Sequence, residues 1–300
     1  MACGAVFDDS ALPASAQRLI TLASGQETDD AILPEPPSID RQLGRWVINQ
    51  AGKLFGAIEF FGDVMLGSLV GLRGGLKMRA VDLRDCILNA GSMALPIVTI
   101  VNFLVGGILA FAGAVQLSRF GAEIFVANLV GIAVVREMAA VMTGIVMAGR
   151  TGGAYAAHIA TMQSNEEIDA LNVIGIPVRD YLLMPRVLAL TTMVPLLYLY
   201  GCAIGLLGGL TVAVGMLDLT PMAFFEQIRL AISGSQFVFG FAKSIVFGAL
   251  VAIVGCRIGL QAGRSAADVG HTVTSAVVVG IVGVIAGDAV FAIFATVVGF

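Results

Sequence analysis

Four ionisable residues stand within stretches of the sequence that are otherwise apolar: Arg136, Glu137, Lys243 and Asp288. A charged side chain is costly inside a membrane span, so such residues usually face one another or a water-filled cavity. Two kinds of chemistry follow from these residue types. They can form an ion network that fixes helix packing, or they can form a polar element of a transport path or its gate, and the sequence leaves both interpretations open.

The depths of these residues indicate whether they can meet. Arg136, Lys243 and Asp288 lie 14 to 17 residues from the polar residue that closes the cytoplasmic end of each span, roughly 21 to 25 Å along an α-helix. Three spans therefore place charges of both signs at a similar level, where neighbouring helices can pair them. Arg136 and Glu137 are adjacent and about 100° apart around a helix, so we expect that they do not both serve one partner on one face.

A second cluster of ionisable residues lies between two apolar stretches, in the polar segment 149–186. We expect a short helix at about 164–173 there, capped by Ser164 or Asn165 and stopped by Gly175. Acidic residues fill its first turn, which suits the helix dipole. This form fits an element that couples the membrane helices to a partner through Glu166, Glu167, Ile168, Asp169 and Leu171, or alternatively an ordinary structured loop.

The sequence lacks the motifs of a nucleotide-hydrolysing or hydrolytic enzyme. It has no Gly-x-x-x-x-Gly-Lys loop, no His-Glu-x-x-His and no Gly-x-Ser-x-Gly. Its two histidines and four cysteines have neither metal-site nor disulfide-framework spacing. We therefore expect no catalytic residue, no bound metal or cofactor and no nucleic-acid partner, and any work derived from ATP must come from another polypeptide.

The elements that position these residues are membrane helices. Of the 300 residues, 58% are hydrophobic and 13% are charged, whereas a soluble domain carries about a quarter charged residues. We predict an all-α membrane protein with five spans. They lie at about residues 86–116, 122–147, 181–216, 236–256 and 272–298, and the glycine-rich stretch after Arg150 ends or bends the second.

Residues before the first span divide into two parts. Residues 1–40 are polar and proline-rich, which is typical of an extension or linker. Residues 43–72 show helical spacing with Trp46 on the apolar side, which favours an amphipathic helix lying in the membrane interface, or alternatively one packed on protein. Arginines cluster in the loops at 149–186 and 257–271, so the positive-inside rule places these loops and the N-terminus in the cytoplasm.

Several motifs in order resemble the MlaE/YrbE permease family. They are Arg136-Glu137, Ala148-Gly149-Arg150-Thr151-Gly152, the stretch from Asn165 to Leu171, and Pro185-Arg186. The resemblance runs from about residue 43 to 300, so residues 41–300 are expected to form the permease domain. Residues 4–24 look like the end of a STAS domain, as in a truncated fusion.

The resemblance implies a homodimeric permease of an ABC transporter in the bacterial inner membrane, with an interfacial helix and five spans. A cytoplasmic, MlaF-like ATPase would carry ATP and Mg and dock on the helix at 164–173, and a periplasmic, MlaD-like MCE-domain protein would sit opposite. Such complexes move phospholipids or related lipids between membranes. The four intramembrane charges match polar positions of the family. The acyl chains would lie near the dimer axis, where we expect Leu104, Leu109, Phe111, Val290 and Phe291.

Two other functions fit the same residues. An ion- or proton-coupled secondary transporter would use Glu137 or Asp288 as its ion site. An inverted repeat would support it, but five spans do not divide into equal halves. A purely structural assembly subunit would need the charges for the yield of the complex and not for transport.

Overall fold

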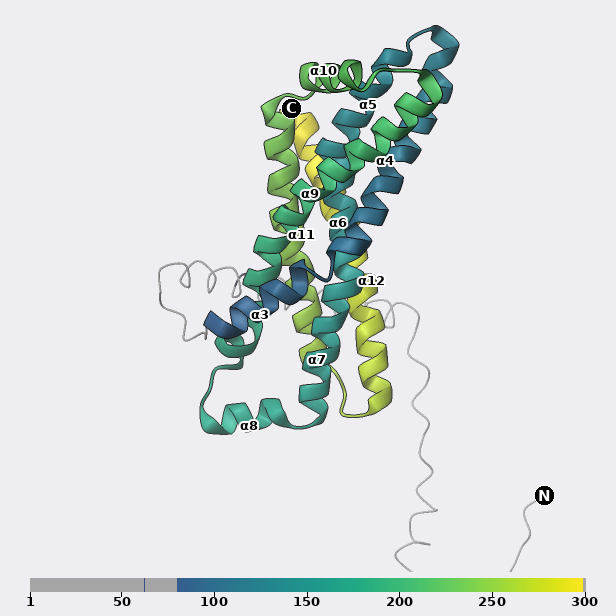
Figure 1. Cartoon of the computed structure of the whole chain (residues 1–300). Coiled ribbons are helices and arrows are strands. Elements are labelled where there is room, and N and C mark those ends of the chain that lie inside the picture. Colours follow the sequence, from purple (N-terminus) through teal and green to yellow (C-terminus); the bar gives the residue numbers. More distant parts are fainter. Residues whose placement is uncertain (1–61, 63–79, 299–300) are drawn as a thin grey trace, which may run out of the picture. The chain divides into compact units, whose positions relative to one another are not determined.

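The computed structural model describes residue 62 and residues 80–298, which form helices joined by short turns (Figure 1). Within this part of the chain, five helical segments are long and apolar enough to cross a membrane. They run over Val81–Phe120, Glu123–Ser164, Arg179–Leu217, Gly234–Leu260 and Ala266–Val297. The predicted class, a helical protein with five spans, is therefore confirmed. The extension at 1–40, the segment at 4–24 and, apart from residue 62, the helix at 43–72 lie outside the described residues.

The first span consists of two helices. Helix α3 (Ala80–Gly91) is joined by a tight turn to α4 (Leu95–Leu117). Pro96 stands in the first turn of α4, where its missing N–H costs no helical hydrogen bond. The sequence predicted one continuous span from residue 86, whereas the structure interrupts this stretch between Gly91 and Leu95.

The second span is longer than predicted. It comprises α5 (Val126–Ala133), a π-helical turn (Val134–Met138), α6 (Ala139–Met147), a second π-helical turn (Ala148–Gly152) and α7 (Gly153–Ser164). The expected end near residue 147 is wrong because the glycines there serve close packing. A Cβ at Gly152 would lie 3.0 Å from the Val251 side chain, and one at Gly153 would lie 2.9 Å from Val277.

The remaining elements complete the bundle. They are α8 (Glu167–Ile174), a π-helical turn (Arg179–Leu183), α9 (Met184–Leu217), α10 (Pro221–Ala231), α11 (Gly234–Leu260) and α12 (Ala266–Val298). Helix α10 was not predicted, although the sequence carries its start signal. Thr220 caps it by accepting a hydrogen bond from the Ala223 N–H at 3.3 Å, and Pro221 takes the first helical position.

Helices α9 and α11 form the centre of the bundle, with α4 packed on α9 and α12 packed on α11 and α7. The α4–α9 contact depends on glycine. A Cβ at Gly106 would lie 1.9 Å from the carbonyl oxygen of Gly205, so the two backbones touch. Small residues allow this approach, which gives membrane helices dispersion contacts that lipid cannot replace.

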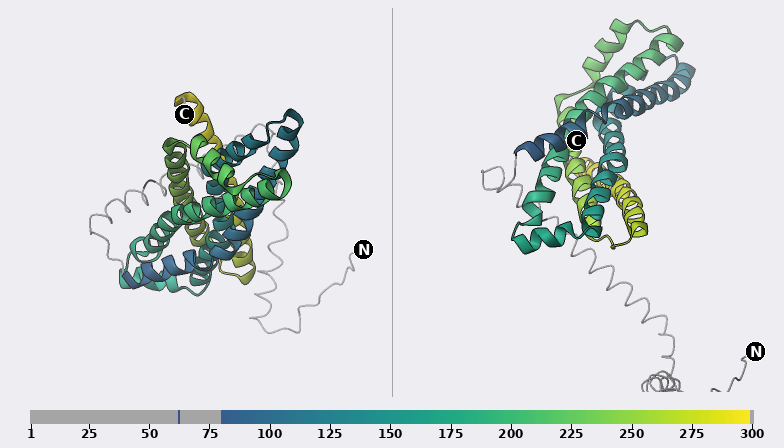
Figure 2. Two further views of the ribbon diagram at one scale, coloured as in Figure 1. Left: turned by 45° about the horizontal axis from the view of Figure 1, so that its top comes forward. Right: turned by 60° about the horizontal axis from the view of Figure 1, so that its bottom comes forward.

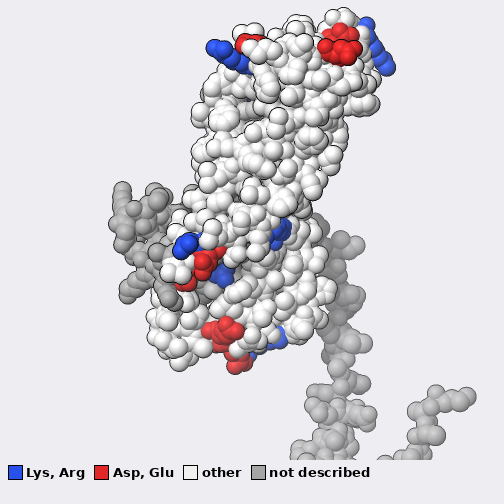
Figure 3. Space-filling view, viewed as in Figure 1, with Lys and Arg blue, Asp and Glu red and all other residues white. Residues whose placement is uncertain are grey.

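The two ends of the bundle differ in structure. We call the end with α8 and the α11–α12 turn (residues 261–265) the α8 end, and the end with α10 and the α4–α5 turn the α10 end (Figures 1 and 2). Figure 3 shows charged side chains at the α10 end and in the half that carries α8, with an uncharged surface between them. This pattern is typical of a protein whose middle faces hydrocarbon.

Candidate functional site

The four intramembrane charges meet in one place, which we call the ion cluster (Arg136, Glu137, Lys243 and Asp288). The Lys243 ammonium forms ion pairs with the carboxylates of both Glu137 and Asp288. Glu137 Oε1 also lies 3.4 Å from Arg136 Nε. Because the second, fourth and fifth spans contribute to this cluster, it connects three membrane helices that are distant in the sequence.

The cluster is buried unevenly. The Lys243 side chain is fully buried, whereas about a quarter of each of the other three side chains is exposed, from 25% for Asp288 to 26% for Arg136 and Glu137. The formal charges of two cations and two carboxylates cancel. The buried ammonium is therefore compensated, and both carboxylates keep an accessible side, a geometry that suits a packing element as well as a polar gate.

The aromatic ring of Phe239 lies next to both cations of the cluster. The Phe239 ring centroid lies 5.6 Å from Arg136 Cζ and 5.3 Å from Lys243 Nζ, within cation–π range. Phe291 contacts Phe239 edge-to-face at 5.9 Å between centroids and Phe247 at 6.2 Å. Phe291, which was predicted to line the lipid site, is thus placed in an aromatic group beside the ion cluster.

Arg136 and Glu137 lie in the π-helical turn Val134–Met138. Glu137 contacts both Arg136 and Lys243, and both cations contact Phe239, so the two neighbours belong to one cluster. The expectation that they do not both serve one partner on one face stays a prediction. A π-helical turn departs from regular α-helical spacing, and such turns occur frequently at functional sites. Sequence reasoning based on 100° per residue could not show this.

Two further residues, which the sequence did not single out, shape this turn. The fully buried Tyr198 of α9 donates a hydrogen bond to the carbonyl oxygen of Val135 at 2.7 Å. Gly240 of α11 allows the close approach, since a Cβ there would lie 2.4 Å from both the Tyr198 Oη and that carbonyl oxygen. Gly240 precedes Lys243 by about one helical turn, so the approach also brings Lys243 to Glu137.

Helix α8 is where the sequence predicted it, but its start differs. Neither Ser164 nor Asn165 caps the helix. Ser164 Oγ donates to the carbonyl oxygen of Arg264 at 2.9 Å, and Asn165 Nδ2 donates to Glu167 Oε1 at 3.1 Å. Glu166 takes the N-cap position with a positive φ of 60°. The capping prediction is wrong because these side chains bond elsewhere, whereas Gly175, with φ of 81°, ends the helix as expected.

Some of the residues predicted to contact a partner are buried against their own chain, and others are exposed. Ile168 is buried and Leu171 is half-buried, so they attach α8 to its own chain. Glu166 and Asp169 pair with Arg264 of the α11–α12 turn, at 3.4 and 3.0 Å. The exposed apolar side chains of α8 are instead Val173 and Ile174 at its C-terminal end.

The residues predicted for the lipid site lie on separate faces. Leu104 and Phe111 are exposed on α4, and Leu109 is half-buried there. Val290 is exposed on α12. Since α4 packs mainly on α9 and α12 mainly on α11 and α7, these side chains do not line one cavity within a single described chain.

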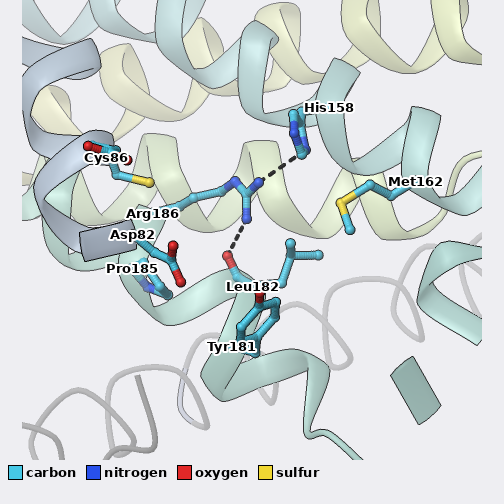
Figure 4. A pocket seen from close by; sticks show the side chains of 9 residues that line it. Asp82, Cys86, His158, Met162, Tyr181, Leu182, Pro185 and Arg186 are labelled. Atoms are coloured by element: carbon cyan, nitrogen blue, oxygen red, sulfur yellow. Dashed lines mark hydrogen bonds between the residues drawn. The ribbon is translucent and has the colours of Figure 1, made fainter. Parts of the chain in front are cut away.

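A pocket of about 310 Å³ lies between α3, α7 and the start of α9 (Figure 4). Arg186 projects into it, donating to the Leu182 carbonyl oxygen at 2.5 Å and lying 3.1 Å from His158 Nδ1. Asp82 and Asp85 of α3 also line it. The Pro185-Arg186 motif therefore joins α9 to α7 and is not part of the ion cluster.

A helical bundle whose five apolar spans hold an ion cluster defines the class of this protein as a multi-pass membrane protein. The particular family is then clear: residues 84–294 match the family model described as Permease MlaE, and the chain belongs to that family. It is an ABC transporter permease, a non-catalytic membrane subunit, and this class of protein implies an ATPase partner.

Relatives in three groups of organisms agree with this assignment. A probable ABC transporter permease of Rickettsia prowazekii is 36% identical over 192 residues, covering 64% of this chain and 74% of its own. One of Synechocystis is 33% identical over 233 residues, covering 75% and 84%. The chloroplastic protein TRIGALACTOSYLDIACYLGLYCEROL 1 of Arabidopsis thaliana is 30% identical over 206 residues, covering 69% and 59%.

Proposed function

We propose that this permease moves phospholipids or related lipids between bacterial membranes, driven by a separate ATPase. Membership of the MlaE family is the observation that carries the proposal. The name of the Arabidopsis relative refers to trigalactosyldiacylglycerol, a lipid with two acyl chains, which supports lipid as the substrate class. In this proposal ATP and Mg bind to the partner and not to this chain.

The α8 end is proposed to face the cytoplasm and to receive the ATPase. Most arginines of the described residues lie in the half of the bundle that carries α8, which supports this orientation by the positive-inside rule. They are Arg84, Arg150, Arg179, Arg186, Arg257 and Arg264, whereas Arg119 and Arg229 belong to the α10 end and Arg136 to the ion cluster. An MCE-domain protein would then meet the α10 end on the periplasmic side of the inner membrane.

A homodimer is proposed to complete the lipid site. Leu104 and Phe111 of α4 and Val290 of α12 expose apolar side chains that one copy does not enclose. A second copy would bring such faces together around acyl chains, with Leu109 and Phe291 behind them. The accessible sides of Glu137 and Asp288 would then supply a polar element for the headgroup path or its gate.

Membership of an ABC transporter family favours ATP-driven transport over the ion-coupled alternative in which Glu137 or Asp288 binds the ion. Reconstitution separates the two. The purified complex with its ATPase is placed in vesicles of phosphatidylethanolamine and phosphatidylglycerol that contain a fluorescent phospholipid, and transfer to acceptor vesicles is followed. We expect transfer that requires ATP.

Transfer driven by an imposed proton gradient without the ATPase would contradict this proposal. A complex that assembles but never moves lipid would instead support the assembly role. The double variant Glu166→Lys, Glu167→Lys tests the docking of the ATPase at α8, and unchanged transfer would overturn that assignment.

A further inference from the structure

We propose that Arg264 is a positioning residue that fixes α8 to the α11–α12 turn, so that the two form one composite surface for the ATPase and move together. The inference rests on the proposed docking of the ATPase at α8, and it adds a second element to that interface. It also adds a route by which displacement of α8 reaches the fourth and fifth spans.

Three contacts from one residue carry the proposal. The guanidinium of Arg264 holds two acidic side chains of the α8 segment, with NH1 3.4 Å from Glu166 Oε1 and NH2 3.0 Å from Asp169 Oδ2. The backbone of the same residue accepts a hydrogen bond from Ser164 Oγ at 2.9 Å. The attachment thus spans the last residue of α7 and the first turn of α8.

The backbone at this junction gives a second, independent observation. Glu166 adopts a left-handed conformation with φ of 60°, which is uncommon for a residue with a side chain and strained relative to glycine. Such conformations persist where the surroundings hold them in place. At Glu166 two backbone hydrogen bonds hold this conformation, from its own N–H to the Gln163 carbonyl oxygen at 3.2 Å and from the Ala170 N–H to its carbonyl oxygen at 3.0 Å, so that its side chain is presented to Arg264.

The attachment changes which spans α8 can move. Along the chain, α8 is joined only to α7 and to α9, the helices of the second and third spans. Through Arg264 it is also joined to α11 and α12. Those two helices carry Lys243 and Asp288, so a displacement of α8 reaches every span that contributes to the ion cluster.

The attachment also determines which part of α8 remains for the partner. With Glu166 and Asp169 engaged by Arg264, the side chains most available at the C-terminal end are Val173, 89% exposed, and Ile174, 71% exposed. The ion pairs are themselves more than half open to solvent at Arg264 and contribute little to stability. Their loss should therefore affect coupled motion more than folding.

The test uses the complete complex with its ATPase in phospholipid vesicles and compares lipid transferred with ATP hydrolysed. For Arg264→Glu we expect normal assembly and continued hydrolysis, but a fall of at least about fivefold in lipid transferred per ATP, the lower range of energetic coupling between sites. Adding Asp169→Arg restores the opposite-charge contact and should recover most of the transfer. The matched control is Arg84→Glu in α3, which makes the same charge change at an exposed position outside α8 and the α11–α12 turn and should leave the ratio unchanged.

The outcomes separate this inference from the proposed function. If the wild-type complex moves no lipid with ATP, the proposed function fails. If the wild type moves lipid and Arg264→Glu moves it equally well per ATP, only the role of Arg264 fails. If Arg264→Glu abolishes binding of the ATPase and Asp169→Arg does not restore it, Arg264 contacts the partner directly, and the positioning role is overturned.

Discussion

The hydroxyl of Tyr198 donates a 2.7 Å hydrogen bond to the carbonyl oxygen of Val135, across the interface between α9 and the π-helical turn that carries Glu137. The Tyr198 side chain is fully buried, so no solvent competes for this bond. The turn is thus held from outside its own helix. Because Glu137 follows Val135 by two residues, the hydrogen bond helps to fix the carboxylate that pairs with Lys243.

Tyr198→Phe removes the donor and leaves a buried carbonyl oxygen without it. We expect a loss of about 1 kcal/mol in the free energy of unfolding in detergent, since interhelical hydrogen bonds in membranes contribute about that much. Lipid transfer should fall because Glu137 loses its orientation. The control is Tyr200→Phe, which removes a 2.7 Å hydrogen bond to Thr99 away from the ion cluster. Equal transfer by the two variants would argue against an orienting role.

Lys243→Ala leaves the carboxylates of Glu137 and Asp288 without their shared cation in a site of low dielectric. Removal of one partner from a buried ion pair costs about 3–5 kcal/mol, so we expect a large drop in melting temperature and in the yield of monodisperse protein. Size-exclusion chromatography and thermal unfolding in detergent measure both. Wild-type stability of this variant would show that the pairs contribute nothing to folding.

An exchange of charges distinguishes packing from transport. The double variant Lys243→Asp, Asp288→Lys keeps one cation and two carboxylates in the cluster but moves the cation from its centre to position 288, and we expect it to recover part of the stability lost in Lys243→Ala. If the cluster serves only packing, lipid transfer returns together with stability. If the cluster lies in the transport path, stability returns and transfer does not, because the fully buried position of the cation is lost.

Hydropathy and the depth of charges were sufficient to predict the membrane elements and the meeting of Lys243 with acidic residues. Both depend on sequence-local quantities: runs of apolar residues, and distance along a helix from a polar end. The expectation that three spans place charges of both signs at a similar level is matched by the ion pairs of Lys243 with Glu137 and Asp288. Their roles in transport stay predictions.

The features that the sequence did not predict depend on contacts between distant segments. The glycines after Arg150 resemble a break, but they pack against Val251 and Val277 and the helix continues to Ser164. Ser164 is a good capping residue by type, yet its hydroxyl bonds to Arg264, 100 residues later. Helix α10 was also missed, but for a different reason. Its Thr-Pro start is visible in the sequence, and it was overlooked because it is too short to be a membrane span.

The α4–α9 interface predicts a sharp difference between two adjacent glycines. Gly106→Ala would bring its Cβ to 1.9 Å from the Gly205 carbonyl oxygen, whereas Gly107→Ala would meet nothing closer than 3.6 Å. We expect the first variant to separate the helices and lower stability by about 1–3 kcal/mol, the usual cost of overpacking. The second should stay within about 0.5 kcal/mol of wild type. Similar melting temperatures for both would contradict the close contact.

The C-terminal end of α8 predicts how the ATPase is held. The double variant Val173→Asp, Ile174→Asp places two charges where the wild type exposes apolar side chains, and these side chains are too exposed to contribute much to folding. We therefore expect an unchanged melting temperature but a loss of more than about tenfold in affinity for the ATPase, since about 1.4 kcal/mol corresponds to a factor of ten. Co-purification and a titration of the tagged ATPase measure this affinity.

The control variant is Leu230→Asp on α10, which changes an exposed apolar residue at the opposite end of the bundle. This variant should bind the ATPase as the wild type does. If the α8 variant binds as tightly as the control, the ATPase is held by other surfaces, and the apolar end of α8 has no part in coupling.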